Sequence, residues 1–406
     1  MKIRTITLLV DPQREPLEKS LPQLGAFAAQ ATAACEAAGI QVQTRRLATA
    51  PFPFWADLNQ PASFVNLALR TEELAQQNGL NFLSFGPALP EFPSSFAMIP
   101  PALAATKNLF FSAAMTTQEH RISNLAVHAC AEIITQCANF TTDGMTNLRF
   151  AALGNVPPGG PFFPAAYHTT GMPPAVAMGL ECADEILAIF QSAETLGQAR
   201  QQLLNRLENV AACLTEAIQP VVNEFSLKFI GFDFSSAPYP SSCCSVGGAL
   251  EALGVPQLGL HGSVAASAFL ADTLKQGKWQ QVGFNGMMLP VLEDLVLAQR
   301  SAEGFLSTKD LLLFACMCGT GLDTVPLPGD SSPQAVAALL LDLAAISLRL
   351  DKPLTARLMP IPGKKAGDSI EFNFEYLTNG KIMALEGAPL TGLLGRQAEI
   401  EIHPLH

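Results

Sequence analysis

Residues 148–155, Leu-Arg-Phe-Ala-Ala-Leu-Gly-Asn, form an apolar run that leads directly into residues 156–164, Val-Pro-Pro-Gly-Gly-Pro-Phe-Phe-Pro. A short apolar run bounded by Pro and Gly is typical of a buried strand followed by a loop. The same order recurs at residues 226–234, which precede Ser235 and Ser236. In parallel α/β folds the functional loops follow the carboxyl ends of the strands. We therefore expect the site at those ends.

Strand-like and helix-like segments alternate on both sides of this stretch. The further strands are expected at residues 5–10, 41–46, 82–86, 108–113, 354–359, 370–374 and 399–403. The helices are expected at residues 21–38, 67–77, 120–137, 175–190, 196–224, 247–253, 264–275, 289–300, 310–316 and 335–350. This alternation predicts βαβ units and a mainly parallel sheet. No linker divides the chain, so we expect one α/β domain over residues 1–406.

The composition excludes several classes of protein. Of the 406 residues 49% are hydrophobic and 15% are charged, which favours a large compact core. The net charge is -11 and the densest basic run is Lys364-Lys365, so we expect no nucleic-acid partner. The first apolar run, residues 6–10, is too short for a signal peptide or a membrane span. We therefore expect a cytoplasmic protein that does not bind a membrane.

The nine cysteines are dispersed and form no Cys-x-x-Cys pair. Such a pattern indicates reduced thiols and argues against a structural zinc site of the finger or ribbon type. The motifs of phosphate-binding loops, dinucleotide-binding turns and zinc proteases are absent as well. The sequence therefore assigns no cofactor and no metal.

Four motifs carry a resemblance to a known family. They are residues 161–168 (Pro-Phe-Phe-Pro-Ala-Ala-Tyr-His), 258–262 (Leu-Gly-Leu-His-Gly), 283–294 and the long Gly-rich segment 316–330. The segments 4–7, 233–238 and 357–360 agree too. In these motifs the chain resembles the uncharacterised domain-of-unknown-function 711 family. The resemblance implies a pyruvate formate-lyase-like barrel of two parallel half-sheets surrounded by helices, and a homodimer. It implies no particular activity.

The resemblance in fold raises the question of radical chemistry. Glycyl-radical enzymes resemble one another in an Arg-Val-x-Gly-aromatic segment near the C-terminus, whereas this tail offers only Gly392 and Gly395 in a different setting. The adjacent Cys243 and Cys244 resemble the paired cysteines of pyruvate formate-lyase, but two small residues beginning a helix explain them better. We therefore expect polar rather than radical chemistry.

Two histidines are candidates for acid/base catalysis. His168 ends a Pro-bounded aromatic segment on a loop, and its free pKa of about 6.5 suits a general base. His261 precedes Gly262 and Ser263 at an expected helix start, where free N–H groups favour an anion. For each histidine the alternative is an ordinary loop residue with hydrogen-bonded ring nitrogens.

The acidic and Gly-rich segments supply the remaining candidates. Asp233 with Ser235 and Ser236 could orient a histidine or bind a hydroxylated substrate, or it could form an Asx turn. The segment Cys318-Gly319-Thr320-Gly321-Leu322-Asp323 could bind an anion through its N–H groups, with Asp323 as a site residue and Cys318 more readily a buried thiol than a nucleophile.

Glu293 at an expected helix start and Arg357 near a Pro-Gly turn complete the set. Glu293 could instead only stabilise the helix dipole, and Arg357 could hold a carboxylate or phosphate. The proposed catalytic residues are thus His168, His261, Asp233, Glu293 and Asp323. The proposed ligand-binding residues are Ser235, Ser236, Gly262, Ser263, Cys318, Gly319, Thr320, Gly321 and Arg357.

Two functions follow from these residues. The first is an enzyme that acts on a small polar, anionic metabolite by acid/base chemistry of the hydrolase or lyase type. The second is a small-molecule-binding or regulatory protein that uses the same pocket without chemistry. Polar residues gathered in Gly-rich loops are poorly explained by packing alone.

Overall fold

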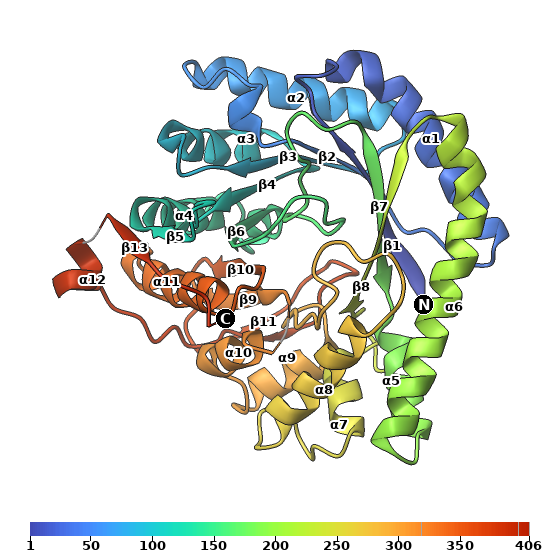
Figure 1. Ribbon diagram of the computed structural model, residues 1–406. Coiled ribbons are helices and arrows are strands. Elements are labelled where there is room, and N and C mark those ends of the chain that lie inside the picture. The colour runs from blue at the N-terminus through green and yellow to red at the C-terminus, as the bar shows by residue number, and fades with distance from the viewer. Residues whose placement is uncertain (318, 397, 406) are drawn as a thin grey trace.

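A nine-stranded mixed sheet forms the centre of the protein. The computed structural model describes residues 1–317, 319–396 and 398–405. The strand order is β8-β7-β1-β2-β3-β4-β6-β10-β9. The strands are β1 (Lys2–Val10), β2 (Arg45–Thr49), β3 (Phe82–Ala88), β4 (Leu109–Ala114), β6 (Phe150–Gly154), β7 (Ala175–Glu181), β8 (Lys228–Ala237), β9 (Gly321–Pro328) and β10 (Leu354–Ile361). Figure 1 shows them running round an arc, with helices along its outside.

The sheet is mostly parallel and reverses direction at both sides. Strands β1, β2, β3, β4 and β6 run parallel to one another. On one side β7 pairs antiparallel with β1, and on the other side β10 pairs antiparallel with β6. The outermost strands β8 and β9 run parallel to β7 and β10. The prediction of an α/β fold with a mainly parallel sheet is confirmed.

Helices cover the convex side of the arc and connect the strands. They are α1 (Leu17–Ala37), α2 (Pro61–Gln77), α3 (Ile99–Ala105), α4 (Asn124–Ala138), α5 (Ala183–Ser192), α6 (Leu196–Glu224), α7 (Val246–Ala252), α8 (Ser263–Lys275), α9 (Leu295–Ala302), α10 (Thr308–Ala315), α11 (Pro333–Arg349) and α12 (Gly392–Arg396). The short 3-10 helices are η1 (Phe52–Phe54), η2 (Pro93–Met98) and η3 (Met145–Arg149). One large apolar cluster joins the strands to α1, α4, α6 and α11.

Two small sheets lie outside the main one. Strand β11 (Ser369–Ile370) pairs with β12 (Gly380–Lys381), and β5 (Arg121–Ser123) pairs with β13 (Glu399–Glu401). The first of these carries the loop 371–379 between its strands. The second attaches the C-terminal tail to the amino end of α4.

Several element predictions are wrong, and the largest error concerns residues 175–190. The expected helix is in fact strand β7 followed by α5. All seven residues of β7 are buried, so its apolar run shows no strand alternation. The expected helix at residues 289–300 begins only at Leu295, and β9 occupies part of the segment expected to be a Gly-rich loop.

Two expected strands are also misplaced. Strand β2 begins at Arg45, and the expected residues before it contribute only a bridge between Val42 and Ile3. The strand expected at residues 370–374 ends at Ile370. No helix of the described residues is both long and apolar enough to cross a membrane.

Candidate functional site

A chain of alternating charges crosses the concave side of the sheet. Arg4 of β1 donates to Glu181 (Nη1 to Oε2, 3.0 Å) and to Glu293 (Nη2 to Oε2, 2.9 Å). Arg357 of β10 donates to the other oxygen of Glu293 (2.6 Å) and, through Nε, to Asp323 of β9 (2.5 Å). We call these five residues the ion-pair chain. Their side chains are between 5 and 14% exposed, so the charges are largely removed from water.

Neighbouring backbone contacts place Glu293 at the centre of this chain. Val291 N–H donates to the carbonyl oxygen of Asp323 (3.0 Å), and Leu292 N–H donates to Oγ1 of Thr324 (3.2 Å). On the other side Asp294 is the N-cap of α9 and accepts from the N–H groups of residues 296 and 297. Glu293 is therefore held between strand β9 and a helix start, which explains why it projects towards both arginines.

Arg46 of β2 lies beside this chain without a carboxylate. Its Nε donates to Thr44 Oγ1 (2.9 Å), the one hydrogen bond found for its guanidinium among the described residues. The guanidinium lies 5.4 Å from the ring centre of Phe82 and 5.2 Å from that of Phe163. Arg46 is only 9% exposed. A buried guanidinium that no carboxylate contacts is costly and favours a bound anion.

Arg46 and the ion-pair chain meet at a cavity of about 420 Å³, which we call the arginine pocket. Arg4, Arg46, Phe82 and Phe110 reach it from the amino ends of β1, β2, β3 and β4. Glu293, Asp323 and Arg357 line its floor, and the loop 374–377 lies at its mouth. The expectation of a site at the carboxyl ends of the central strands is wrong for this pocket, because the amino ends of β1–β4 face it.

The electrostatics of the pocket follow from burial and close charges. Burial lowers the pKa of Arg46 to about 9, and the nearby guanidinium groups of Arg4 and Arg357 act in the same direction, whereas the charge of Glu293 opposes the shift. Burial and then the charge of Glu293 raise the pKa of Asp323, although Arg357 opposes the rise. Burial alone would lower the pKa of Arg357, but the carboxylates of Asp323 and Glu293 raise it above its ordinary value. Asp323 is thus the carboxyl group here with an enhanced tendency to carry a proton.

Asp233, Ser235 and Ser236 lie fully buried at the end of β8, where they bind the loop 283–288. Asp233 accepts from the backbone N–H groups of Phe284 (2.7 Å) and Asn285 (3.0 Å), and Ser235 Oγ donates to it (2.6 Å). Ser236 Oγ accepts from the N–H of residue 288 (3.2 Å). These contacts place Met288 in the wall of the arginine pocket, so the segment shapes the pocket from outside it.

His168 lies at the opposite end of the sheet from the arginine pocket. Its backbone N–H donates to the carbonyl oxygen of Thr49, the last residue of β2. Its Nε2 lies 3.0 Å from the carbonyl oxygen of Pro173 and 3.3 Å from that of Met172. Burial lowers the pKa of His168, although these carbonyl groups and Asp11 oppose the shift. The Nε2 atom of His168 therefore already has hydrogen-bond partners in the backbone.

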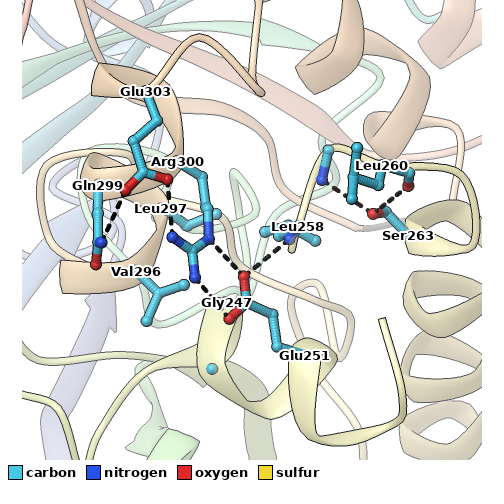
Figure 2. Close-up of polar contacts among 12 residues, drawn as sticks. Gly247, Glu251, Leu258, Leu260, Ser263, Val296, Leu297, Gln299, Arg300 and Glu303 are labelled. Atoms are coloured by element: carbon cyan, nitrogen blue, oxygen red, sulfur yellow. Dashed lines mark hydrogen bonds and ion pairs between the residues drawn. The ribbon is translucent and has the colours of Figure 1, made fainter. Parts of the chain in front are cut away.

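His261 and Gly262 lie on an outer turn before α8, and Ser263 is the first residue of that helix; all three are apart from the pocket-lining residues. Figure 2 shows how polar contacts tie this region together. Ser263 Oγ donates to the carbonyl oxygen of Leu260 (2.7 Å) and accepts from Gly259 N–H (2.9 Å). Such bonds are those of a tight turn, and the imidazole of His261 lies at the exposed surface.

A neighbouring ion pair supports the same turn. Arg300 donates to both carboxylate oxygens of Glu251, at 2.7 and 3.0 Å. The carboxylate also accepts from Leu258 N–H (2.8 Å), and Arg300 makes a second pair with Glu303 (2.8 Å). Figure 2 shows these residues pointing toward one another between α7, α9 and the turn.

The Gly-rich segment before β9 contacts the same loop 283–288. Thr320 Oγ1 donates to the carbonyl oxygen of Met287 (3.0 Å). Gly321 has a φ of +92°, and a Cβ atom there would lie 2.4 Å from the carbonyl oxygen of Thr355. Gly319 packs against the backbone of Phe284, whereas the predicted site residue Cys318 lies outside the described residues.

The structure therefore brings together three of the predicted site residues, Glu293, Asp323 and Arg357, and places the two histidines elsewhere. Among the residues that the structure describes, no group of three or more His, Cys, Asp or Glu side chains could hold a metal ion. The predicted site residues do not include Arg46, Glu181 or the aromatic residues that line the pocket. A signal for Arg46 is present, because it stands in an expected strand immediately before the apolar Leu47-Ala48.

The chain is similar to proteins of one family over most of its length. Residues 1–375 match the family described as "Uncharacterised ACR (DUF711)". A UPF0210 protein of Pyrobaculum aerophilum is 32% identical over 367 residues, which cover 86% of this chain and 79% of that protein. UPF0210 proteins of Acetivibrio thermocellus and Methanosarcina mazei are 28% and 29% identical over 379 and 356 residues, which cover 89% and 82% of this chain and 83% and 77% of theirs.

Proposed function

Because this chain belongs to the uncharacterised DUF711 family, we propose its function from the arginine pocket itself. It is an enzyme that binds a small anionic metabolite on Arg46 and acts on it by acid/base chemistry. Asp323 carries the proton in this proposal, Glu293 is the second carboxylate, and Arg357 holds both in place. The reaction is of the hydrolase or lyase type.

The observation that carries the proposal is the buried guanidinium of Arg46. Arg4 and Arg357 each donate to two carboxylates, whereas Arg46 donates only to the hydroxyl of Thr44 among the described residues. Charge-assisted bonds between a guanidinium and a carboxylate or phosphate are about twice as strong as neutral ones. An anion in the pocket would therefore complete the charge pattern.

The acid/base step is supported by the unequal surroundings of two carboxyl groups. Glu293 accepts from two arginines, while Asp323 accepts from one and has a raised pKa through burial. A pair of carboxyl groups with different surroundings is suited to one proton donor and one permanent anion. Gly392 and Gly395 lie on the exposed helix α12, which supports polar rather than radical chemistry.

We also propose that the sheet closes as a barrel of the pyruvate formate-lyase type. Residues 281–291 pass between the outermost strands, with a bridge from Gln281 to Phe232 of β8 and another from Pro290 to Asp323 of β9. This segment joins the edges of the two reversed strand pairs. A structure determined by crystallography tests the closure, since an open gap between β8 and β9 would contradict it.

The homodimer remains a proposal from the family resemblance. Exposed leucines near the tail support it, namely Leu390, Leu393 and Leu394, together with Leu125 at the start of α4. The carbonyl oxygen of Leu394 accepts from the side chain of Asn124, which places these leucines together. Light scattering after size-exclusion chromatography measures the mass, and a monomer at micromolar concentration would contradict the proposal.

The alternative is a binding protein without turnover. It is favoured by the placement of His168 and His261 outside the pocket lining, and by the pairing of Glu293 and Asp323 with arginines. A paired carboxylate is a weaker base than a free one. The two functions differ in whether a bound ligand is converted.

The test compares Arg46→Gln with Arg45→Gln, its neighbour on the same strand. Small carboxylates and phosphates are mixed with the purified protein, and binding and conversion are followed by ligand-detected NMR. We expect Arg46→Gln to weaken binding at least about tenfold, because a bond to a charged group contributes about 1.5–3 kcal/mol, and Arg45→Gln to leave it unchanged. Asp323→Asn should retain binding and abolish conversion. Binding without any conversion by the unmodified protein favours the alternative, and equal binding by Arg46→Gln refutes the proposal.

A further inference from the structure

The arginine pocket combines partly exposed aromatic rings with one arginine, Arg46, that no carboxylate contacts among the described residues. From this combination we infer that its ligand is a monocarboxylate with a flat, aromatic body. The carboxylate binds Arg46, and the body lies against Phe82 and Phe110 beneath the loop that carries Tyr376. The inference rests on the proposed function and specifies its substrate class.

The charge of the ligand follows from the count of charges around the pocket. Three arginines line the pocket, Arg4, Arg46 and Arg357, and two carboxylates lie on its floor, Glu293 and Asp323. Arg4 and Arg357 pair with these carboxylates, whereas Arg46 makes no ion pair among the described residues. A monoanion on Arg46 forms one bidentate pair, as guanidinium and carboxylate geometry allows.

A dianion fits this arrangement poorly. Its second charge would lie close to Glu293 and Asp323 on the pocket floor or to Glu375 at the mouth. Like charges this close together repel one another strongly in a partly buried site. The pocket therefore discriminates against phosphate esters and dicarboxylates in favour of a single carboxylate.

The body of the ligand follows from the aromatic wall. Phe82 is the first residue of β3 and Phe110 the second residue of β4. Both are only partly buried, and they pack edge to face with ring centres 5.3 Å apart. Phe110 makes a second edge-to-face contact with Phe163 at 5.3 Å. Rings arranged this way leave aromatic surface open to the cavity, against which a flat aromatic ligand can stack or pack edge to face.

The mouth of the pocket presents a second aromatic surface. The ring of Tyr376 lies over the guanidinium of Arg4, 4.9 Å from its carbon to the ring centre. Tyr376 also packs against Phe374 (5.4 Å) and against Tyr239 (5.9 Å, edge to face). These contacts fix the loop between β11 and β12 opposite the wall formed by Phe82 and Phe110. A cavity of about 420 Å³ between them suits a small flat molecule.

The experiment uses four probe ligands that differ in the charge of the anionic group and in the shape of the body. They are cinnamate, cyclohexanecarboxylate, phenyl phosphate and succinate, and their dissociation constants are measured by calorimetry with the full-length protein. We expect cinnamate to bind at least about fivefold more tightly than each of the others. Arg46→Gln should weaken cinnamate binding about tenfold or more, and Phe110→Leu by about two- to tenfold, which corresponds to the aromatic contribution. Arg45→Gln is the matched control, and thermal melting of each variant confirms that it is folded.

The outcomes separate the inference from the proposed function. If cyclohexanecarboxylate binds as tightly as cinnamate, or Phe110→Leu binds cinnamate unchanged, the flat body is refuted. If phenyl phosphate or succinate binds more tightly and Arg46→Gln removes that binding, the monocarboxylate is refuted while the proposed function stands. If no probe binds at 10 mM (about 2.7 kcal/mol of binding free energy), or if Arg46→Gln leaves binding unchanged, both the inference and the proposed function are refuted.

Discussion

Arg4 and Arg357 donate to the two oxygens of the same carboxylate, that of Glu293, although their strands are five positions apart in the sheet. Neighbouring strands lie about 4.8 Å apart, so in a flat sheet β1 and β10 would be separated by about 24 Å. Side chains stand roughly perpendicular to a sheet and could not converge across that distance. The shared carboxylate therefore requires the sheet to curl, and the curl creates the arginine pocket.

Replacing Glu293 by Gln tests how much this bridge contributes to stability. The variant leaves two buried guanidinium groups with one carboxylate each, and removal of one partner from a buried pair costs about 3–5 kcal/mol. We expect the free energy of unfolding in urea to fall by about 3 kcal/mol. The matched control is Glu303→Gln, which removes the more exposed of the two carboxylates that pair with Arg300 (Figure 2). Arg300 keeps its two bonds to Glu251, so this variant should change little. Equal losses in the two variants would contradict the structural role of Glu293.

The titration of Asp323 predicts a pH-dependent stability. Its pKa in the folded protein is raised above the ordinary value of 3.8, so the folded state binds this proton more tightly than the unfolded state. The contribution of this bound proton to the free energy of unfolding is fully present below pH 3.8 and is lost as the pH rises through the folded-state pKa. We expect the free energy of unfolding of Asp323→Asn, relative to the unmodified protein, to increase between about pH 4 and pH 7. Urea unfolding at several pH values measures it, and a constant difference would show that Asp323 titrates normally.

His168 predicts the opposite slope in a different range. Because burial lowers its pKa below 6.5 in the folded protein, the unfolded chain takes up the proton first as the pH falls. The stability that depends on the neutral ring is present above pH 6.5 and is lost on acidification. His168→Gln retains an N–H donor for the carbonyl oxygen of Pro173 and should lose less stability between pH 7.5 and pH 5. Urea unfolding at several pH values measures the loss, and an equal loss in His168→Gln and in the unmodified protein would contradict this prediction.

Gly321 separates a structural from a ligand-binding explanation of the Gly-rich segment. Gly321→Ala places a Cβ atom 2.4 Å from the carbonyl oxygen of Thr355 at a φ of +92°, so we expect a loss of about 3 kcal/mol or more. Gly363→Ala has a similar φ of +74° with no atom within 4 Å of the new Cβ and should cost only about 1–2 kcal/mol. Thermal melting compares them. Equal shifts would mean that the contact with Thr355 relaxes freely.

Helices with a polar face are predictable from the sequence, and fully buried strands are not. The expected helix at residues 196–224 agrees with α6 residue for residue, because its buried positions recur at helical spacing. Strand β7 has no exposed position, so its sequence shows neither the alternation of a strand nor the spacing of a helix. The prediction of a helix there is therefore wrong. The error also concealed the antiparallel pairing of β7 with β1.

The candidate site was only partly predictable for a similar reason. Glu293, Asp323 and Arg357 lie in motifs that the family resemblance singled out, whereas Arg46 lies in none of them. Whether an arginine near a strand start is buried depends on the curl of the sheet, which joins residues from both ends of the chain. The intrinsic pKa of a histidine favours His168 and the helix start favours His261, but the loops that carry the two residues lie away from the pocket.

The shared carboxylate of Glu293 also has a consequence for how the protein is made. A ribosome adds roughly 5–20 residues per second, so roughly 20–70 seconds pass between the synthesis of Arg4 and that of Arg357. During that interval Arg4 can pair with Glu181 of the adjacent strand β7. Because its other partners are so distant in sequence, the completed pocket is a late product of folding, and folding rates fall as contacts become less local. During synthesis Arg4 can thus have one of its two carboxylate partners, Glu181, long before the pocket is complete enough to bind a ligand.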